Sequence, residues 1–313
     1  MNKIVSHEGV DQEGETAELK GNKKASFILG KEDLDANNLY LMKSRLAMAL
    51  NRVNPRQYEL DFFGSRPDST PYPKDLCRSG LFSIEQTVAR ESLKNIEIFS
   101  TDPTVKIFFT GEDLQSATDE RVWAHLIHTA KDKPLNQIVR TKVSDIIKGI
   151  GKPCNGHYYN MVWTSLERLY RSDIKVIKGT KRKTVAFIRM VNLHKAIGDN
   201  VDSDGEIHYS LDNSFNGWLL LVANNTTTLL TNNAVKKLKP MAFALYKYGM
   251  SHKEPRPISI SDFHKMCRSR AKLETPQNFA HWRSYVRKAI KELLEKKLFT
   301  DCYISNDFIF FIR

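Results

Sequence analysis

The order of helices and strands that the sequence indicates predicts an α+β fold, with two tandem winged helix-turn-helix domains behind a partly disordered N-terminal extension. Twice along the chain, segments with helical periodicity are followed by two strand-like segments that flank a polar turn. Basic charge is concentrated in the same part of the chain. Residues 104–313 hold 34 basic and 20 acidic side chains, whereas residues 1–103 hold 14 and 16.

The N-terminal region divides into an extension, residues 1–55, and a linker, residues 56–72. Residues 1–30 are polar and lack periodicity, which predicts disorder, and the leucines of Asp33–Arg52 predict a short helix. Proline, glycine, serine and aspartate dominate the linker. The start of the chain lacks the apolar segment of a signal peptide, and its four cysteines form no C-x-x-C pair, so we expect a cytoplasmic protein.

The first winged-helix domain is predicted over residues 73–225. In chain order its expected elements are strands at 96–99 and 105–109, helices at 118–130, 141–149 and 156–171, and strands at 174–178, 184–191, 206–211 and 218–222. Thr118 is the expected N-cap of its helix, because a hydroxyl there can accept a hydrogen bond from an exposed amide. The strands that directly follow the third helix are expected to form the wing, with Lys181, Arg182 and Lys183 at its tip.

The second winged-helix domain is predicted over residues 226–313. Its expected elements are helices at 233–248, 259–271 and 275–297, followed by strands at 298–304 and 308–312. Ser259 or Ser261 can cap the second helix, and Thr275-Pro276 is a typical start for the third. The two domains share this order of elements without detectable sequence similarity.

The third helix of the second domain has separate apolar and basic stripes. Trp282, Val286, Ala289 or Ile290, and Leu293 recur at helical spacing and predict the buried side. Another face carries the basic residues Arg283, Arg287, Lys288 and Lys291. Arginine can bind phosphate or make a bidentate contact to guanine, so this face is a candidate for the major groove of duplex DNA. The alternative is a solvated helix surface that binds nothing.

The third helix of the first domain has a more polar candidate face. Its members are His157, Asn160, Thr164, Arg168 and Arg171, at spacings of three or four residues. Asparagine, threonine and arginine are side chains that read base edges or bind phosphates. In the alternative, this is an ordinary polar face on which Arg168 pairs with a nearby carboxylate. The basic turn 181–183 likewise is either a wing tip or a turn without a ligand.

Signatures of catalysis, cofactor binding and metal binding are missing from the sequence. Gly149–Lys152 does not complete a P-loop. His125 and His128 lack the glutamate of H-E-x-x-H and are expected to be a core or surface pair. The acidic cluster at 199–206 lacks the spacing of an EF-hand and is expected to be a loop. We therefore expect no enzyme activity, no cofactor and no metal.

Four segments resemble the TrfA family of plasmid replication initiators. Residues 73–82 follow its P-x-x-x-x-R-S-x-L-F-type pattern, and the likeness continues at 107–114, at 118–126 and at 156–160 with 166–169. The resemblance implies two winged-helix domains that bind direct repeats, called iterons, at a plasmid origin in bacteria and promote opening of the neighbouring DNA. It also implies host partners, namely DnaA, the replicative helicase and the polymerase sliding clamp.

The linker contains a candidate partner-binding peptide. Residues 57–62 resemble the Q-x-x-L-x-[LF] form of bacterial clamp-binding peptides, although Tyr58 stands where leucine is more usual. Gln57 would hydrogen-bond at the rim of a pocket while Leu60 and Phe62 fill it. The alternative is a strand or anchor that packs on the first domain.

Three functions remain open from the sequence alone. The first is an initiator that binds iterons, and the second is a transcriptional regulator with the same folds that represses its own promoter. The third is a DNA-processing enzyme such as a relaxase or recombinase, against which the lack of metal-ligand spacing argues. A dimer seam in Asp33–Arg52 would suit a regulator, so the balance of monomer and dimer also stays open.

Overall fold

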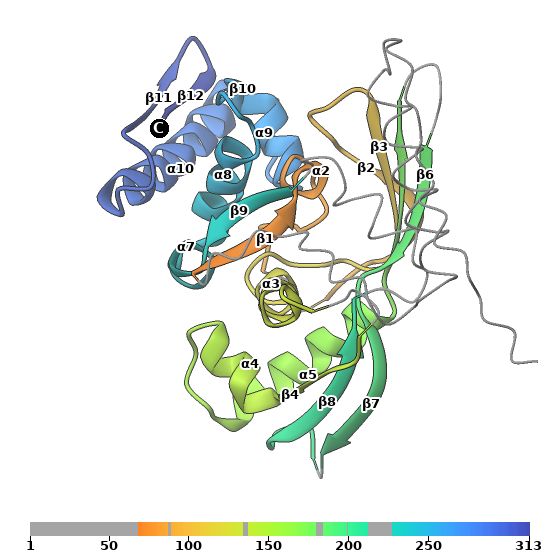
Figure 1. Ribbon diagram of the computed structural model, residues 1–313. Coiled ribbons are helices and arrows are strands. Elements are labelled where there is room, and N and C mark those ends of the chain that lie inside the picture. The colour runs from red at the N-terminus through yellow and green to blue at the C-terminus, as the bar shows by residue number, and fades with distance from the viewer. Residues whose placement is uncertain (1–67, 87–88, 134–136, 180–183, 199, 212–226) are drawn as a thin grey trace, which may run out of the picture. The chain divides into compact units, whose positions relative to one another are not determined.

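The computed structural model describes residues 68–86, 89–133, 137–179, 184–198, 200–211 and 227–313 (Figure 1). The chain separates into units 1–44 and 45–313, and the described residues belong to the second. The predicted helix Asp33–Arg52, the peptide 57–62, the turn 181–183 and the strand 218–222 lie outside the described residues. Among the residues that are described, no helix is both long and apolar enough to cross a membrane.

Module 1 consists of three helices and three strands. In chain order they are α3 (Asp119–Ala130), β4 (Val139–Lys142), α4 (Val143–Gly149), α5 (Gly156–Tyr170), β7 (Asn192–Gly198) and β8 (Gly205–Ser210). The strands form an antiparallel sheet of order β4-β8-β7, and α3 packs against α4 and α5 (Figure 1). The predicted third helix is confirmed, with Val162, Leu166 and Leu169 buried.

Module 2 repeats this order. Its elements are α8 (Pro240–Met250), β10 (Ile258–Ser259), α9 (Ile260–Met266), α10 (Pro276–Glu295), β11 (Asp301–Ser305) and β12 (Phe308–Ile312). The sheet order, β10-β12-β11, matches β4-β8-β7 strand for strand. The predicted terminal hairpin is confirmed, and its turn holds Asn306 and Asp307 with positive φ angles of 45° and 60°. Asparagine and aspartate tolerate this left-handed conformation better than most residues do.

A four-stranded sheet corrects the predicted wing of the first domain. Its members are β2 (Ser92–Ile98), β3 (Val105–Glu112), β5 (Asp173–Lys178) and β6 (Thr184–Arg189), in the order β2-β3-β5-β6. β5 and β6 directly follow α5 and pair with each other, as predicted, but they belong to this sheet and not to the sheet of β4. In module 1 it is β7 and β8 that pair in the sheet of β4, and residues 181–183 lie between strands of another sheet.

Two segments link the modules. β1 (Ser69–Pro73) pairs with β9 (Thr227–Thr231) in an antiparallel ladder, and the short helices α2 (Lys74–Cys77) and α7 (Asn232–Lys237) follow these strands. All five residues of β1 are buried. The predicted linker 56–72 is therefore wrong in its last residues, which form a buried strand because Thr70 and Tyr72 pack inward.

Three predicted helices have different bounds for local reasons. The helix expected at 233–248 is two helices, α7 and α8, because Pro240 forces the preceding Lys239 into extended backbone, with ψ of 156°. Thr141 and Lys142 belong to β4, whose pairing with β8 delays α4. The second helix of module 2 ends at Met266, shortly before Arg268 takes a positive φ of 45°. Its predicted N-cap Ser259 is confirmed, because Ser259 Oγ accepts a hydrogen bond from Asp262 N.

The start of α3 differs from the prediction in chemistry. Thr118 does occupy the N-cap position, but its side chain makes no capping hydrogen bond. Instead Thr118 Oγ1 accepts a hydrogen bond from Arg90 Nη2 at 3.2 Å. The fully buried Asp119 accepts from Gln115 N at 2.8 Å and pairs with Arg90 and Arg168. An aspartate in the first turn therefore anchors the helix, which also suits the positive end of the helix dipole.

A buried ion pair joins the first helices of the two modules. Glu120 on α3 is fully buried and pairs with Lys247 on α8, which is 4% exposed. Tyr72 Oη donates to Glu120 Oε1 at 2.6 Å, and Ser116 Oγ donates to Glu120 Oε2. Burial, and then the Glu120 carboxylate, hold the pKa of Tyr72 well above its ordinary value. Both carboxylate oxygens are satisfied, as a buried charge requires.

Further along α3, Arg121 is buried and His125 is half-buried. The Arg121 guanidinium lies 4.0 Å from the centre of the Phe243 ring and donates to Leu238 O at 2.7 Å, and burial lowers its pKa to about 10. The ring of His125 packs so closely on Gly149 that a Cβ there would lie 2.1 Å from it. Burial lowers the pKa of His125 to about 4, so the ring is neutral at pH 7.

Replacement of Lys247 by methionine is expected to cost roughly 3–5 kcal/mol of unfolding free energy, because it leaves the Glu120 carboxylate buried without its counter-charge. Urea unfolding of the full chain measures the loss. Glu120→Gln combined with Lys247→Met should recover most of it, because glutamine can still bond Tyr72 and Ser116. A single variant as stable as the parent chain would contradict the assigned role of the pair.

Candidate nucleic-acid interface

Helix α5 begins at a side-chain cap and exposes one polar face. Asn155 Oδ1 accepts a hydrogen bond from Tyr158 N at 3.1 Å. The opposite side of the helix is buried in module 1. The exposed or half-exposed residues on the polar face are His157, Asn160, Thr164, Glu167 and Arg171. Four of these five residues were predicted as candidate DNA contacts.

Two hydrogen bonds orient this face. Thr164 Oγ1 donates to Asn160 O at 2.7 Å and lies 3.0 Å from Asn160 Oδ1. The hydroxyl of Thr164 has one proton to share between these two oxygens, so the Asn160 amide keeps an acceptor and two donors for a ligand. One turn further along, Arg171 pairs with Glu167 at 2.6 Å, and both side chains are more than half exposed. The face therefore offers donors and acceptors together, which is what base edges in a major groove require.

Arg168 is a correction to the predicted set. Its Nη1 lies 2.8 Å from Asp119 Oδ1, its Nε lies 3.2 Å from Glu112 Oε2, and its side chain is only 15% exposed. The alternative left open by the sequence, a pair with a nearby carboxylate, describes this geometry. A guanidinium held between α3 and β3 contributes to the packing of α5 and is not presented on its outer face.

Helix α10 is capped by Thr275 Oγ1, which accepts from Asn278 N at 3.2 Å. The predicted apolar stripe is confirmed, because Trp282, Val286, Ala289, Ile290 and Leu293 are all buried. Complete burial of each of the larger side chains contributes roughly 1.5–3 kcal/mol, so the helix is firmly seated in module 2. The exposed residues of its N-terminal and central turns are Pro276, Gln277, Asn278, Ala280, His281, Ser284, Tyr285, Arg287, Lys288 and Lys291.

The predicted basic residues of α10 divide into two groups. Arg287, Lys288 and Lys291 are exposed. The Lys288 ammonium lies 5.3 Å from the Tyr285 ring, and Lys291 lies 3.8 Å from Glu295. Arg283 is half-buried and bonds Asp307 Oδ1 at 3.0 Å, so it faces the turn between β11 and β12. The structure thus places Arg283 against the turn between β11 and β12 and leaves the other three outward.

The two third helices expose the same positions. Counted from the N-cap as position 0, positions 2, 5, 9, 12 and 16 are outward on both. In α5 they hold His157, Asn160, Thr164, Glu167 and Arg171, and in α10 they hold Gln277, Ala280, Ser284, Arg287 and Lys291. The sequence reasoning missed Glu167, Gln277 and Ser284. Alignment of the two helices on their caps is the signal that could have found them.

Charge differs between the two interfaces. The face of α5 combines Glu167 with Arg171, and the neighbouring turn between β7 and β8 carries Asp202 and Asp204. Burial acts to raise the pKa of Asp204, but hydrogen bonds from the amides of Ser144 and Gly205 outweigh it and lower the value. The face of α10 carries three exposed cations. The exposed face of α10 is therefore more positively charged than that of α5.

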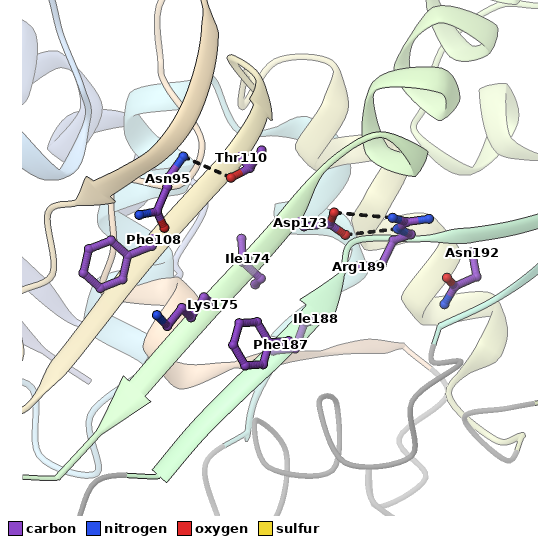
Figure 2. Close-up of a pocket in the computed structure, with 10 residues that line it drawn as sticks. All are labelled: Asn95, Phe108, Thr110, Asp173, Ile174, Lys175, Phe187, Ile188, Arg189 and Asn192. Atoms are coloured by element: carbon purple, nitrogen blue, oxygen red, sulfur yellow. Dashed lines mark hydrogen bonds and ion pairs between the residues drawn. The ribbon is translucent and has the colours of Figure 1, made fainter.

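A groove on the outer face of the four-stranded sheet, about 520 Å³ in volume, is the other candidate site (Figure 2). The Lys175 ammonium lies between two rings, 5.6 Å from Phe108 and 5.7 Å from Phe187. Arg189 pairs with Asp173 at 3.0 Å. All three charged side chains that line the groove, Asp173, Lys175 and Arg189, have partners within it, and none of the predicted DNA-binding residues lines it. This arrangement gives no support to an effector site of the kind that a regulator would need.

Arg168→Ala is expected to lower the free energy of unfolding by roughly 2–3 kcal/mol, because the buried Asp119 then keeps only Arg90 as its ionic partner. The matched variant Arg171→Ala removes an exposed pair on the same helix and should change stability by less than about 0.5 kcal/mol. Urea unfolding of the full chain compares the two. Equal stabilities for both variants would place Arg168 among the exposed polar residues after all.

Comparison with known proteins gives relatives over most of the chain. A curated relative, the plasmid replication initiator protein TrfA of Escherichia coli, is 26% identical over 304 residues, which cover 96% of this chain and 75% of that protein. A crystal structure of domains 2 and 3 of RctB aligns with a TM-score of 0.50 and 14% identity, covering 71% of this chain and 85% of that one. The Pi initiator protein, solved in complex with iteron DNA, aligns with a TM-score of 0.43 and 12% identity over 63% of this chain and 93% of that one.

The likeness to RctB supports the mixed α/β fold described above and nothing further. The family evidence is stronger, because the model of the TrfA protein family matches residues 48–313. This match includes every described element of both modules and the segments that connect them. The chain belongs to the TrfA family of proteins.

Proposed function

We propose that this chain is a plasmid replication initiator that binds iteron repeats as duplex DNA through two winged-helix modules. The observation that carries the proposal is the repeated order of helix, strand, helix, capped helix and hairpin, with a matching sheet order in both modules. In a winged helix the third helix enters the major groove. On this assignment α5 and α10 are the reading helices, and the turns β7–β8 and β11–β12 are the wings.

The residues proposed for DNA contact follow from exposure. In module 1 they are His157, Asn160, Thr164, Glu167 and Arg171, and in module 2 they are Gln277, Ser284, Arg287, Lys288 and Lys291. Asparagine can bond adenine through its amide, and glutamate can accept from cytosine. The exposed cations of α10 would neutralise phosphates and release counterions. Lys181, Arg182 and Lys183 stay a predicted contact outside the described residues.

Membership of the TrfA family favours an initiator over a regulator that only represses its promoter. In this proposal binding at the origin promotes opening of the neighbouring DNA in the bacterial cytoplasm, and host DnaA, the replicative helicase and the sliding clamp then act there. The chain itself would catalyse no covalent step and need no bound cofactor. A regulator remains the second candidate, because both functions use the same DNA-binding geometry.

Duplexes tiled across the DNA that flanks the protein's own coding sequence test the proposal, with binding measured at about 150 mM salt. We expect several complexes on a fragment with tandem repeats, because each repeat takes one copy. Arg287→Ala with Lys291→Ala should lower affinity for every duplex and reduce the slope of log K against log salt by about two, one for each lost phosphate contact.

Binding only to a single palindrome at the promoter would favour the regulator instead. Equal, salt-sensitive binding to every fragment would mean that the chain binds DNA only through a basic surface, without sequence preference. A metal-dependent nick in a supercoiled substrate would identify a DNA-processing enzyme.

We further propose that residues 57–62, outside the described residues, bind the sliding clamp. The support is the order of Gln57, Leu60 and Phe62, which suits a rim hydrogen bond and an apolar pocket. Leu60→Ala with Phe62→Ala is expected to weaken clamp binding, measured with purified clamp on a biosensor, while DNA binding stays unchanged. Undiminished clamp affinity would leave the segment as an anchor on the first domain.

A further inference from the structure

Each reading helix holds the wing turn of its own module from the same position. Position 8 is Trp163 in α5 and Arg283 in α10, counted from Asn155 and Thr275. Trp163 Nε1 donates to Ser203 O, in the turn before β8, at 3.2 Å. Arg283 Nη1 donates to Asp307 Oδ1, in the turn before β12, at 3.0 Å. Two unlike side chains therefore make the same connection in the fold.

The second helix of each module holds the same turn. Ser144 N, in the first turn of α4, donates to Asp204 Oδ1 at 2.9 Å. Ile260 N, at the start of α9, donates to Asp307 O at 2.8 Å. Both aspartates directly precede the last strand of their module. Each turn is thus tied to two helices, and its place relative to the reading helix is fixed before any ligand binds.

The packing around the first turn leaves little freedom. A Cβ on Gly205 would lie 2.4 Å from Ile197 O and 2.6 Å from the Trp163 ring, so only glycine fits between them. In the second turn, the left-handed backbone of Asn306 and Asp307 fixes the direction of the Asp307 side chain towards α10. Non-glycine residues in left-handed backbone carry a conformational cost, and they persist where the surrounding structure fixes them, which is often at functional sites.

We propose that position 8 is the wing-positioning site of both modules, and that Arg283 raises DNA affinity by holding Asp307 and not by touching DNA. This inference rests on the proposed DNA-binding function. A turn that is fixed in advance loses less conformational entropy on binding than a free one.

The sequence suggested a different role for Arg283, a direct contact to base or phosphate. The two roles predict opposite changes in DNA affinity when Asp307 is replaced by asparagine. If Arg283 contacts phosphate, Asp307 competes with the DNA for it, so Asp307→Asn should raise affinity. If Arg283 positions the wing, Asp307→Asn should lower affinity, because the tie is weakened. A direct contact also requires that Arg283→Met reduce the salt slope by about 0.9, whereas positioning leaves the slope unchanged.

The test uses the full chain with two duplexes of equal length, one carrying a single repeat found by tiling and one with scrambled sequence. Dissociation constants are measured across a salt series for Arg283→Met, Asp307→Asn and the double variant. We expect about tenfold weaker binding to the repeat for each, an unchanged slope, and a double variant no weaker than the singles, because both remove one tie. Arg283→Lys should recover part of the affinity.

Arg287→Met is the matched control, one turn along the same helix and exposed, and it should reduce the salt slope. Higher affinity for Asp307→Asn, or a reduced slope for Arg283→Met, would overturn the positioning role while leaving DNA binding intact. If the parent chain bound the repeat and the scrambled duplex with equal affinity, the result would instead count against the proposed function.

Amide hydrogen exchange of the DNA-free chain gives a readout that does not depend on binding. Ile260 N–H, which bonds Asp307 O, should exchange faster in Arg283→Met than in the parent chain, at unchanged global stability. Equal exchange would overturn the inference even if the chain bound no DNA. Should Arg283→Met fail to fold, Asp307→Asn in the exposed turn gives the same comparison.

Discussion

The buried pair of Glu120 and Lys247 is the constraint on which the arrangement of the two modules depends. It joins α3 to α8, and these are equivalent first helices of their modules. Each first helix packs against the reading helix of its own module, α5 or α10. The tie between the first helices therefore limits movement between the reading helices. A protein that reads two segments of one duplex needs such a limit, because the spacing of grooves along DNA is fixed.

Polar contacts on every side reinforce this tie. Arg121 of α3 donates to Leu238 O, just before α8. At the other end of α8, Arg78 donates to Ser251 O and Arg313 donates to Gly249 O and His252 O. Cations at a helix C-terminus satisfy carbonyls that lack intrahelical partners and complement the dipole. Arg313 and the segment after β1 thus hold the same end of α8.

The sequence was informative wherever the signal is local. The predicted caps Ser259 and Thr275 stand at their helix starts, and the apolar stripe of α10 is buried as predicted. Prediction failed where membership of a sheet or the choice of an ionic partner depends on distant residues. Nothing within β5 and β6 indicates that they extend the sheet of β2 and β3.

Charged residues on α3 and α8 illustrate the same limit. Asp119 lies 49 positions from its partner Arg168, and Glu120 lies 127 positions from Lys247. A periodicity argument assigns such side chains to solvent, because charge is seldom buried without a partner and the partner is invisible locally. Pro240 is a different case, since its power to end α7 is a local signal that the prediction overlooked.

The unlike residues at position 8 follow from how each wing turn is capped. In module 1 one oxygen of the Asp204 carboxylate, Oδ1, accepts from both Ser144 N and Gly205 N. The reading helix bonds a main-chain carbonyl instead, Ser203 O, through the single donor of Trp163. In module 2 Ile260 N takes the carbonyl of Asp307 and leaves its carboxylate for the reading helix. A cation pairs well with a carboxylate, and Arg283 bonds the carboxylate of Asp307. The reading helix therefore bonds a main-chain carbonyl in module 1 and a carboxylate in module 2, although both bonds hold equivalent turns.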